Sequence, residues 1–429
     1  MRYIPLNNSI YKRNRLNFMN QMKGNCMAIF NSNDIYPVSA DSELPFAQHR
    51  DIFHLAGIDQ EETILILYPS SKDSKTREIL FIRRSDEHTK IWEGEKLSKD
   101  LASKLSGIES IHFVEDFKNI LHLITSKVDT FYINKNEHYR ANSPVETRED
   151  RFISWLLKKY PAHKVAKSNP ILQRLRSIKH IDEIDQIRKA CQITKKGFNR
   201  VLKFIKPDIW EYQIEAEFIH EFINNSSKGF AYSPIIASGQ DNNVLHYVKN
   251  NKQCKDGELI LMDVGAEYGN YSSDMTRTIP VSGHFSKRQK EIYNTVLRVK
   301  NEATKLLTVG NNWKNFHDQV GEIMTKELLD VNLLDKEDIK NQTKKNPAYK
   351  KYFMHGTSHH LGLDTHDYGL LEDIFQENMV FTVEPGIYIP EEGFGVRLED
   401  DVVIQTKGEP INLMEDIPIE TDHIEELMN

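Results

Sequence analysis

One segment constrains the fold of this chain more than any other: residues 259–280, with the sequence LILMDVGAEYGNYSSDMTRTIP. Two apolar, β-branched runs flank a polar stretch, a pattern that predicts a β-hairpin. A two-residue turn at Tyr268 and Gly269 would place Asp263 directly opposite Asp274 on one face of this hairpin. Opposed carboxylates, with Cβ atoms ~4.5–5.5 Å apart, repel each other unless a positive charge lies between them. The hairpin therefore predicts a bound cation whose remaining ligands come from elsewhere in the chain.

A second acidic pair is expected near the C-terminus. Two β-rich runs on either side of a turn at residues 390–395 would bring Glu384 and Glu399 close together. Arg397 lies two residues from Glu399 and would share its face. Because Pro385 cannot donate a hydrogen bond to a ladder, Glu384 is expected where strand pairing ends or bulges.

Histidines lie between the two acidic pairs in the sequence. His355, His359 and His366 crowd a short stretch that contains glycine, and His246 lies upstream. A single acid or histidine is ordinarily a solvated or hydrogen-bonded side chain, but two inward acidic pairs with several histidines indicate a site. Four carboxylates carry a charge that two divalent cations would neutralise, which predicts a dinuclear centre.

The ligand types narrow the choice of metal. Oxygen-rich ligation with one imidazole and no thiolate favours manganese, cobalt, zinc or iron over a closed structural zinc site. Two such ions ~3.5–4 Å apart can activate a water and polarise a carbonyl or phosphoryl oxygen, so the sequence predicts a hydrolase. Cys26, Cys191 and Cys254 are widely separated and are interpreted as buried thiols without a disulfide or metal role.

Composition excludes several classes of partner. The chain has 429 residues, of which 39% are hydrophobic and 28% charged, and its net charge is −7. This length suits two globular domains, and the negative charge argues against binding to nucleic acid or to an anionic membrane. The N-terminus lacks the apolar core of a secretory signal, and no stretch approaches the ~18 apolar residues of a membrane span. A cytoplasmic location is therefore expected.

The chain is expected to form an α/β N-terminal domain over residues 1–172 and an α+β C-terminal domain over residues 173–429, joined through a polar, proline-bracketed stretch at residues 161–170. The elements predicted in the first domain are a helix at Tyr11–Met22, a strand at Cys26–Phe30, a loop leading into a half-buried strand across residues 41–57, and strands at Thr63–Tyr68 and Glu78–Ile82. The elements predicted in the second domain are a long amphipathic helix from about Ile181, a helix at Trp210–Phe222, a strand at Pro234–Ser238, helices at Lys287–Thr308 and Asn312–Leu329, a charged surface excursion at Asn332–Lys351, and the two hairpins.

These residues resemble the pita-bread metallopeptidases and, among them, the aminopeptidase P (Xaa-Pro aminopeptidase) family. The resemblance runs from about Leu175 to Ile404 through LRSIKHIDEI, SGQDNNVLHY, the hairpin 259–280, MHGTSHHLGLDTHD, TVEPGIYI and VRLEDD. It is specific because six ordered segments agree together with the spacing between them.

The resemblance implies a site and an activity. Asp263, Asp274, His359, Glu384 and Glu399 would hold two divalent metal ions, most simply Mn²⁺, with Asp274 and Glu399 bridging them. His246, His355 and His366 would bind the substrate and steady its carbonyl and the tetrahedral intermediate, Glu384 would accept a proton from the attacking water, and Arg397 would hold Asp263 in position. The implied reaction is removal of the N-terminal residue from peptides with proline in the second position.

The first domain is similar in outline to the N-terminal domain of that family, an α/β unit that resembles ribonuclease H. It departs in detail, because Ala47 and Arg50 stand where an arginine and a small polar residue are expected. Trp92 fits a position that approaches a neighbouring subunit's cleft in the family, although plain packing explains it equally well. The family also implies a homodimer.

Other functions on the same fold remain open from the sequence. A proline dipeptidase would cleave only the dipeptide, whereas a methionine aminopeptidase would leave the first ~170 residues without a use. A non-catalytic peptide-binding module and a creatinase-like, metal-free hydrolase are both disfavoured, because all five implied metal ligands are present.

Overall fold

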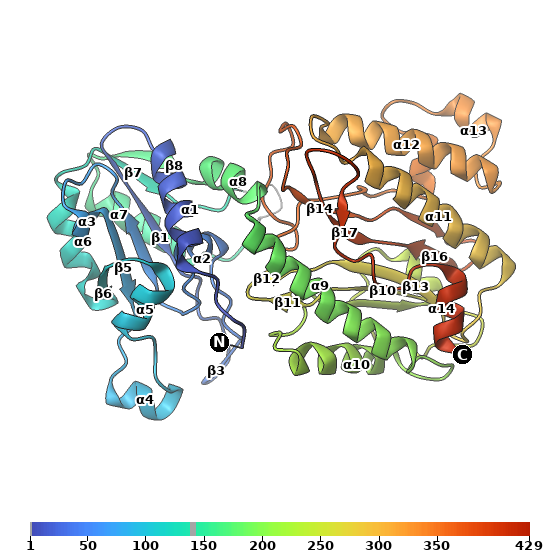
Figure 1. Ribbon diagram of the computed structural model, residues 1–429, viewed down its shortest axis with the longest axis horizontal. Coiled ribbons are helices and arrows are strands. Elements are labelled where there is room, and N and C mark those ends of the chain that lie inside the picture. Colours follow the sequence, from blue (N-terminus) through green and yellow to red (C-terminus); the bar gives the residue numbers. More distant parts are fainter. Residues whose placement is uncertain (1, 138–142) are drawn as a thin grey trace. The chain divides into compact units, whose positions relative to one another are not determined.

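The computed structural model describes residues 2–137 and 143–429 and divides into two compact units (Figure 1). One unit is Pro5–Arg176, and the other is Ser177–Asn429 together with the first residues up to Ile4. The boundary expected after residue 172 falls within helix α8 (Asn169–Ser177) and stays a prediction. Among the described residues, no helix is both long enough and apolar enough to span a bilayer.

The unit Pro5–Arg176 is built on one six-stranded mixed sheet. Its strand order is β6-β5-β4-β1-β7-β8, in which β1 runs antiparallel to β4 and parallel to β7. The strands of the sheet are β1 (Cys26–Asn31), β4 (Ile64–Leu67), β5 (Glu78–Ile82), β6 (Ser110–Phe113), β7 (Thr130–Ile133) and β8 (Lys164–Lys167), and β2 (Pro37–Ser39) and β3 (Ser42–Glu43) form a separate exposed hairpin. Strands β1 and β4 are buried throughout, as expected for the middle of a sheet covered on both faces.

Helices cover both faces of this sheet. Phe18, Leu55 and Ala102 come from three helices and pack with strand residues such as Phe30 on one face, while Leu121 packs with strand residues on the other. The helices of the unit are α1 (Asn8–Gln21), α2 (Arg50–Ala56), α3 (Ser74–Arg77), α4 (Glu87–Glu93), α5 (Lys99–Ser106), α6 (Phe117–Thr125), α7 (Arg148–Lys159) and α8, with a 3₁₀ turn η1 (Val114–Asp116). The predicted α/β class of this domain is confirmed.

The prediction of a half-buried strand near residues 51–57 is wrong, because the segment forms helix α2. The imidazole of His49 accepts a hydrogen bond from the Asp51 backbone N–H at the start of the helix, and Gly57 ends it with φ of 66°. All residues from Asp51 to Ala56 are buried. A helix without an exposed face has no amphipathic period, so the pattern did not identify it.

The unit Ser177–Asn429 places small sheets between two sets of helices. Figure 1 shows α9 and α10 on one side of the strands and α11 and α12 on the other, which agrees with the contacts of α9 with β11 and β12 and of α11 with β14–β16. The helices are α9 (Ile181–Leu202), α10 (Glu211–Asn224), α11 (Lys287–Leu306), α12 (Trp313–Asp330), α13 (Lys336–Asn341) and α14 (Thr421–Met428), with 3₁₀ turns η2 (Gly239–Asn243) and η3 (Ala348–Lys351). The strands are β9 (Ile235–Ser238), β10 (Leu259–Val264), β11 (Glu267–Tyr268), β12 (Tyr271–Ser272), β13 (Met275–Pro280), β14 (Val380–Val383), β15 (Gly386–Ile389), β16 (Phe394–Arg397), β17 (Asp400–Val403) and β18 (Ile411–Asn412).

The first predicted hairpin is present, but its turn lies one residue later than predicted, so the predicted pairing is wrong by two residues. Tyr268 pairs with Tyr271, so the two-residue turn is Gly269-Asn270, and Asp263 pairs with Thr276 instead of Asp274. Both turn residues have positive φ, 60° at Gly269 and 69° at Asn270, as a tight hairpin turn requires.

Candidate metal centre

The first hairpin still brings Asp263 and Asp274 together. Asp263 lies on β10 and pairs with Thr276 of β13. Asp274 lies two residues before Thr276, in the gap between β12 and β13. The two side chains therefore share a face, since the period of a strand is two residues. The hydroxyl of Tyr232 reaches both, at 2.6 Å from Asp263 Oδ1 and 2.5 Å from Asp274 Oδ1. The predicted proximity holds although the direct pairing does not.

The second hairpin brings Glu384 and Glu399 to the same point. The ladders β15–β16 and β14–β17 share one register, which extrapolates to a pairing of Glu384 with Glu399 in the gap between them. Glu384 comes directly after β14 and before Pro385, where pairing is interrupted as predicted. Glu399 is 1% exposed and accepts a hydrogen bond from the Thr276 hydroxyl at 2.6 Å. The first and second hairpins thus meet at Thr276.

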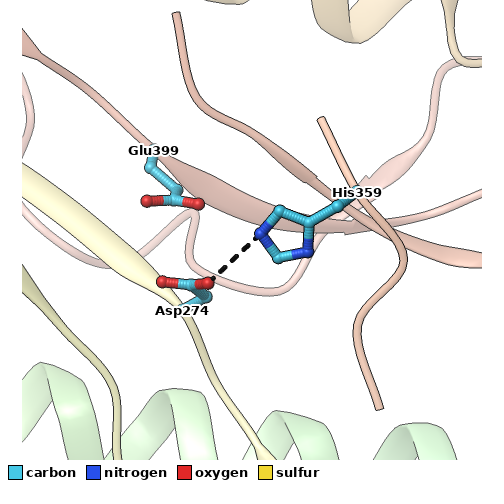
Figure 2. Close-up of side chains that lie close together, drawn as sticks. All are labelled: Asp274, His359 and Glu399. Atoms are coloured by element: carbon cyan, nitrogen blue, oxygen red, sulfur yellow. Dashed lines mark ion pairs between the residues drawn. The ribbon is translucent and has the colours of Figure 1, made fainter. Parts of the chain in front are cut away.

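His359 forms a compact group with Asp274 of the first hairpin and Glu399 of the second. Figure 2 shows Asp274, His359 and Glu399 pointing toward one another, and one donor atom from each lies within 4.8 Å of the others. His359 Nε2 is 3.5 Å from Asp274 Oδ2 and 3.4 Å from Glu384 Oε1. An imidazole nitrogen facing several carboxylate oxygens is a donor set that suits a divalent cation.

The other predicted histidines surround this group. The rings of His359 and His366 are 4.3 Å apart between centroids, edge to face. His355 Nδ1 lies 3.9 Å from Glu384 Oε2. Burial and the charge of Arg397 lower the pKa of His355, and His246, which is exposed, lies near enough to this ring to act on it as well.

Burial and mutual repulsion raise the pKa values of three of the carboxyl groups. Burial raises the pKa of Asp274 and of Glu399 well above the ordinary range, and the neighbouring carboxylates raise it further. Burial raises the pKa of Glu384 to about 7, with His359 opposing the shift and Asp274 adding to it. Acids placed in this way are ionised at neutral pH only when positive charge lies among them. The residues present therefore fit a divalent metal centre.

Arg397 connects Asp263 to the histidines. Its Nη2 donates to Asp263 Oδ2 at 2.7 Å, and its Nη1 donates to the Tyr388 hydroxyl at 2.9 Å. The Tyr388 hydroxyl lies 2.7 Å from His355 Nε2. Arg397 is 3% exposed, so the alternative of a surface ion pair is excluded.

Three side chains that contact this centre were not identified from the sequence: Tyr232, Thr276 and Tyr388. Thr276 and Tyr388 lie on strand faces that follow from the hairpin registers, so correct registers would have found them. Tyr232 lies outside both hairpins, and no local pattern marks it. The three cysteines are buried and free, as interpreted from the sequence, and the Cys191 thiol donates to Asp401.

Family models match both units of the chain. The model of metallopeptidase family M24 matches residues 185–406, which include all five predicted metal ligands. The model described as the aminopeptidase P N-terminal domain matches residues 11–132.

Individual relatives match over nearly the whole length. Xaa-Pro aminopeptidase of Escherichia coli strain K12 is 32% identical over 432 residues, which cover 97% of each chain. Xaa-Pro aminopeptidase 3 of Homo sapiens is 32% identical over 92% of this chain and 79% of the human protein. Among solved structures, zinc-substituted Escherichia coli aminopeptidase P in complex with product matches with a TM-score of 0.89 and 30% identity. Proline aminopeptidase P II from Yersinia pestis matches with a TM-score of 0.88 and 30% identity. Each match covers 99% of both chains.

Proposed function

Because the chain belongs to metallopeptidase family M24 and carries the N-terminal domain of aminopeptidase P, we propose that it is a metal-dependent Xaa-Pro aminopeptidase. It would release the N-terminal residue of peptides that have proline in the second position. The α/β and pita-bread fold expected from the sequence is confirmed by the family and structural matches.

The observation that carries this proposal is the convergence of five donor side chains from two hairpins and one loop. Asp263, Asp274, His359, Glu384 and Glu399 would hold the two divalent ions. The buried, mutually repelling acids and the neighbouring imidazole support this assignment. When bound, the ions polarise the scissile carbonyl and lower the pKa of the attacking water. Family membership implies divalent metal ions, and the oxygen-rich set supports manganese.

The remaining polar groups act on substrate and protons. Glu384 accepts the proton of the attacking water through a carboxylate oxygen and delivers it to the leaving nitrogen. His355, whose ring is held by Tyr388 and Gly356, lines the site with His246 and His366, and together these rings steady the substrate carbonyl and the tetrahedral intermediate. Arg397 holds Asp263 in place through a 2.7 Å hydrogen bond.

Proline as the second residue places a particular demand on the site. The X-Pro bond has no N–H, so recognition depends on an apolar surface around the ring and cannot use a hydrogen bond from the scissile amide. This specificity is supported by the similarity of the chain to Xaa-Pro aminopeptidases. We propose also that the enzyme is cytoplasmic and forms a homodimer.

The test compares three peptides with the protein stripped of metal and reloaded with Mn²⁺. Ala-Pro-Ala should release free alanine, and Ala-Ala-Ala should release little. Cleavage of Ala-Pro but not of Ala-Pro-Ala would identify a dipeptidase instead. If no alanine is released from either proline peptide with Mn²⁺, Co²⁺, Zn²⁺ or Fe²⁺, the proposed activity is wrong.

A further inference from the structure

A large groove lies beside the metal centre in the unit Ser177–Asn429. Its cavity volume is about 1040 Å³, and it is bordered by α12, by η3 with the segment before it, and by residues 353–357. Figure 1 shows α12 and α13 at the outer side of this unit. Apart from His355 and Gly356, the residues that line the groove have no part in the site described above.

The lining of the groove includes aromatic rings, one of which packs closely on a glycine of α12. Tyr349 packs directly on the backbone of α12 at Gly321, where an added Cβ would lie 2.7 Å from the ring. Phe353 lies beside Tyr349 with 6.2 Å between ring centroids. His317 stacks on Trp313, and burial lowers the pKa of His317 below its ordinary value, which disfavours a charge on this ring.

The rim of the groove is basic although the whole chain carries a net charge of −7. Four exposed lysines line it: Lys314, Lys326, Lys344 and Lys350. Lys314 forms an ion pair with Asp318, whereas the other three form none with any residue that the structure describes. Of the residues that line the groove, only Asp318 and Glu322 are acidic, so the four lysines give the rim a net positive charge.

The groove reaches the metal centre through one short segment. Thr357 lines the groove, and its carbonyl accepts a hydrogen bond from the backbone N–H of Glu384 at 2.8 Å. His355 also lines the groove, and its Nδ1 is 3.9 Å from Glu384 Oε2. His355 and Thr357 therefore border both the groove and the backbone or side chain of Glu384.

We propose that this lysine groove, defined by Lys314, Lys326, Lys344 and Lys350 above Tyr349 and Phe353, binds the part of a peptide substrate beyond its proline and favours acidic residues there. The proposal rests on the proposed function. An exopeptidase holds the N-terminal residue at the reacting centre, so the rest of a longer substrate must leave along the surface. Each extended residue advances ~3.3–3.6 Å, so a few residues beyond proline would bring carboxylates to the rim.

The first experiment compares Ala-Pro-Ala-Glu-Glu-Ala with Ala-Pro-Ala-Lys-Lys-Ala on the Mn²⁺-loaded full-length enzyme, with Ala-Pro-Ala as the baseline. At about 0.01 M ionic strength the acidic peptide should have a kcat/KM about fivefold or more above that of the basic one, mainly through KM, because exposed ion pairs contribute modestly and add together. At about 1 M ionic strength, where the Debye length is about 3 Å, the difference should largely disappear.

The second experiment reverses charge in the groove and, as a control, elsewhere. Lys344→Glu/Lys350→Glu should invert the preference and leave Ala-Pro-Ala turnover unchanged. Lys255→Glu/Lys407→Glu, which changes the net charge equally at two exposed lysines outside the groove, should keep the wild-type preference. Equal kcat/KM for the acidic and basic peptides, with Ala-Pro-Ala still cleaved, would overturn the groove proposal and leave the proposed function intact. Loss of Ala-Pro-Ala cleavage in the wild type would overturn both.

Discussion

The carbonyl of Gly356 and the hydroxyl of Tyr388 fix the orientation and the tautomer of His355. The Gly356 oxygen can only accept, so the hydrogen of the neutral ring is on Nδ1, which lies 2.7 Å from that oxygen and donates to it. His355 Nε2 is then an acceptor, and the Tyr388 hydroxyl, whose oxygen accepts from Arg397, donates its hydrogen to Nε2. Burial lowers the pKa of His355 to about 4, so the ring is neutral at pH 7.

Removing this hydroxyl should slow the reaction without disturbing metal binding. Tyr388→Phe leaves the buried ring in place but frees the His355 ring, so kcat/KM for Ala-Pro-Ala should fall about 10- to 100-fold, the usual cost of losing a supporting partner. The metal content, measured by atomic emission, should stay at the wild-type value.

Tyr293→Phe is the matched control for this variant. Tyr293 is as fully buried as Tyr388, and its hydroxyl donates to the Ile419 carbonyl at 2.6 Å, away from the site. Both variants should lose similar thermal stability, but only Tyr388→Phe should lose activity. Equal activities of the two variants would show that Tyr388 does not act through His355.

At the scale of secondary-structure elements, the acidic residues were predictable because hairpins are local. Moving the turn of the first hairpin by one residue shifts its register by two residues, so Asp263 and Asp274 stay on the same face, because the β period is two. The register itself was not predictable with the same certainty, because Tyr268-Gly269 and Gly269-Asn270 both suit a tight turn. The positive φ of Asn270 is a backbone property that the apolar pattern does not report.

Contacts across the fold could not be predicted from the sequence. Helix α2 is buried on every side, so it lacks the amphipathic pattern that identified α9, α11 and α12. Tyr232 is brought to Asp263 and Asp274 from a segment before β9, and only the tertiary arrangement shows this. Periodicity reports which face of an element is buried but not which distant side chain meets it.

Helix α7 carries a buried acid that should make the unit Pro5–Arg176 less stable as the pH rises. Glu149 is 8% exposed and accepts hydrogen bonds from the Asn31 side chain and the Asn134 backbone N–H. Burial raises its pKa from 4.5 to about 7. Between these values the unfolded chain has lost the proton while the folded chain keeps it, so the free energy of unfolding falls by up to about 3 kcal/mol as the pH increases.

Glu149→Gln should remove this dependence. The amide cannot ionise, so the stability of the variant relative to the wild type should rise from about pH 5 to about pH 8, as measured by the urea midpoint. Glu146→Gln, at an exposed acid just before the same helix, should show no such trend. A constant stability difference between Glu149→Gln and the wild type across this range would contradict the account.

At the scale of the whole molecule, the fold is shared with solved structures over 99% of the chain at only 30% identity. Most positions of the chain therefore differ from those structures although the fold is kept. The substrate preference proposed for the lysine groove rests on this chain's own side chains, so it is a property to measure in this chain.

The homodimer expected from the family is tested by the mass in solution. Light scattering coupled to gel filtration should give twice the chain mass of 50.0 kDa at micromolar concentration. A mass equal to a single chain at every concentration would show that the protein is a monomer.

The central claim is that two divalent ions, held by Asp263, Asp274, His359, Glu384 and Glu399, are required for hydrolysis. The measurement that tests it most directly is a titration of the chelator-stripped protein with Mn²⁺, following bound metal and alanine release from Ala-Pro-Ala together. Binding should saturate at about two ions per chain, with activity absent at the start and complete at saturation. Full activity in the stripped protein, or saturation without any activity, would contradict the account.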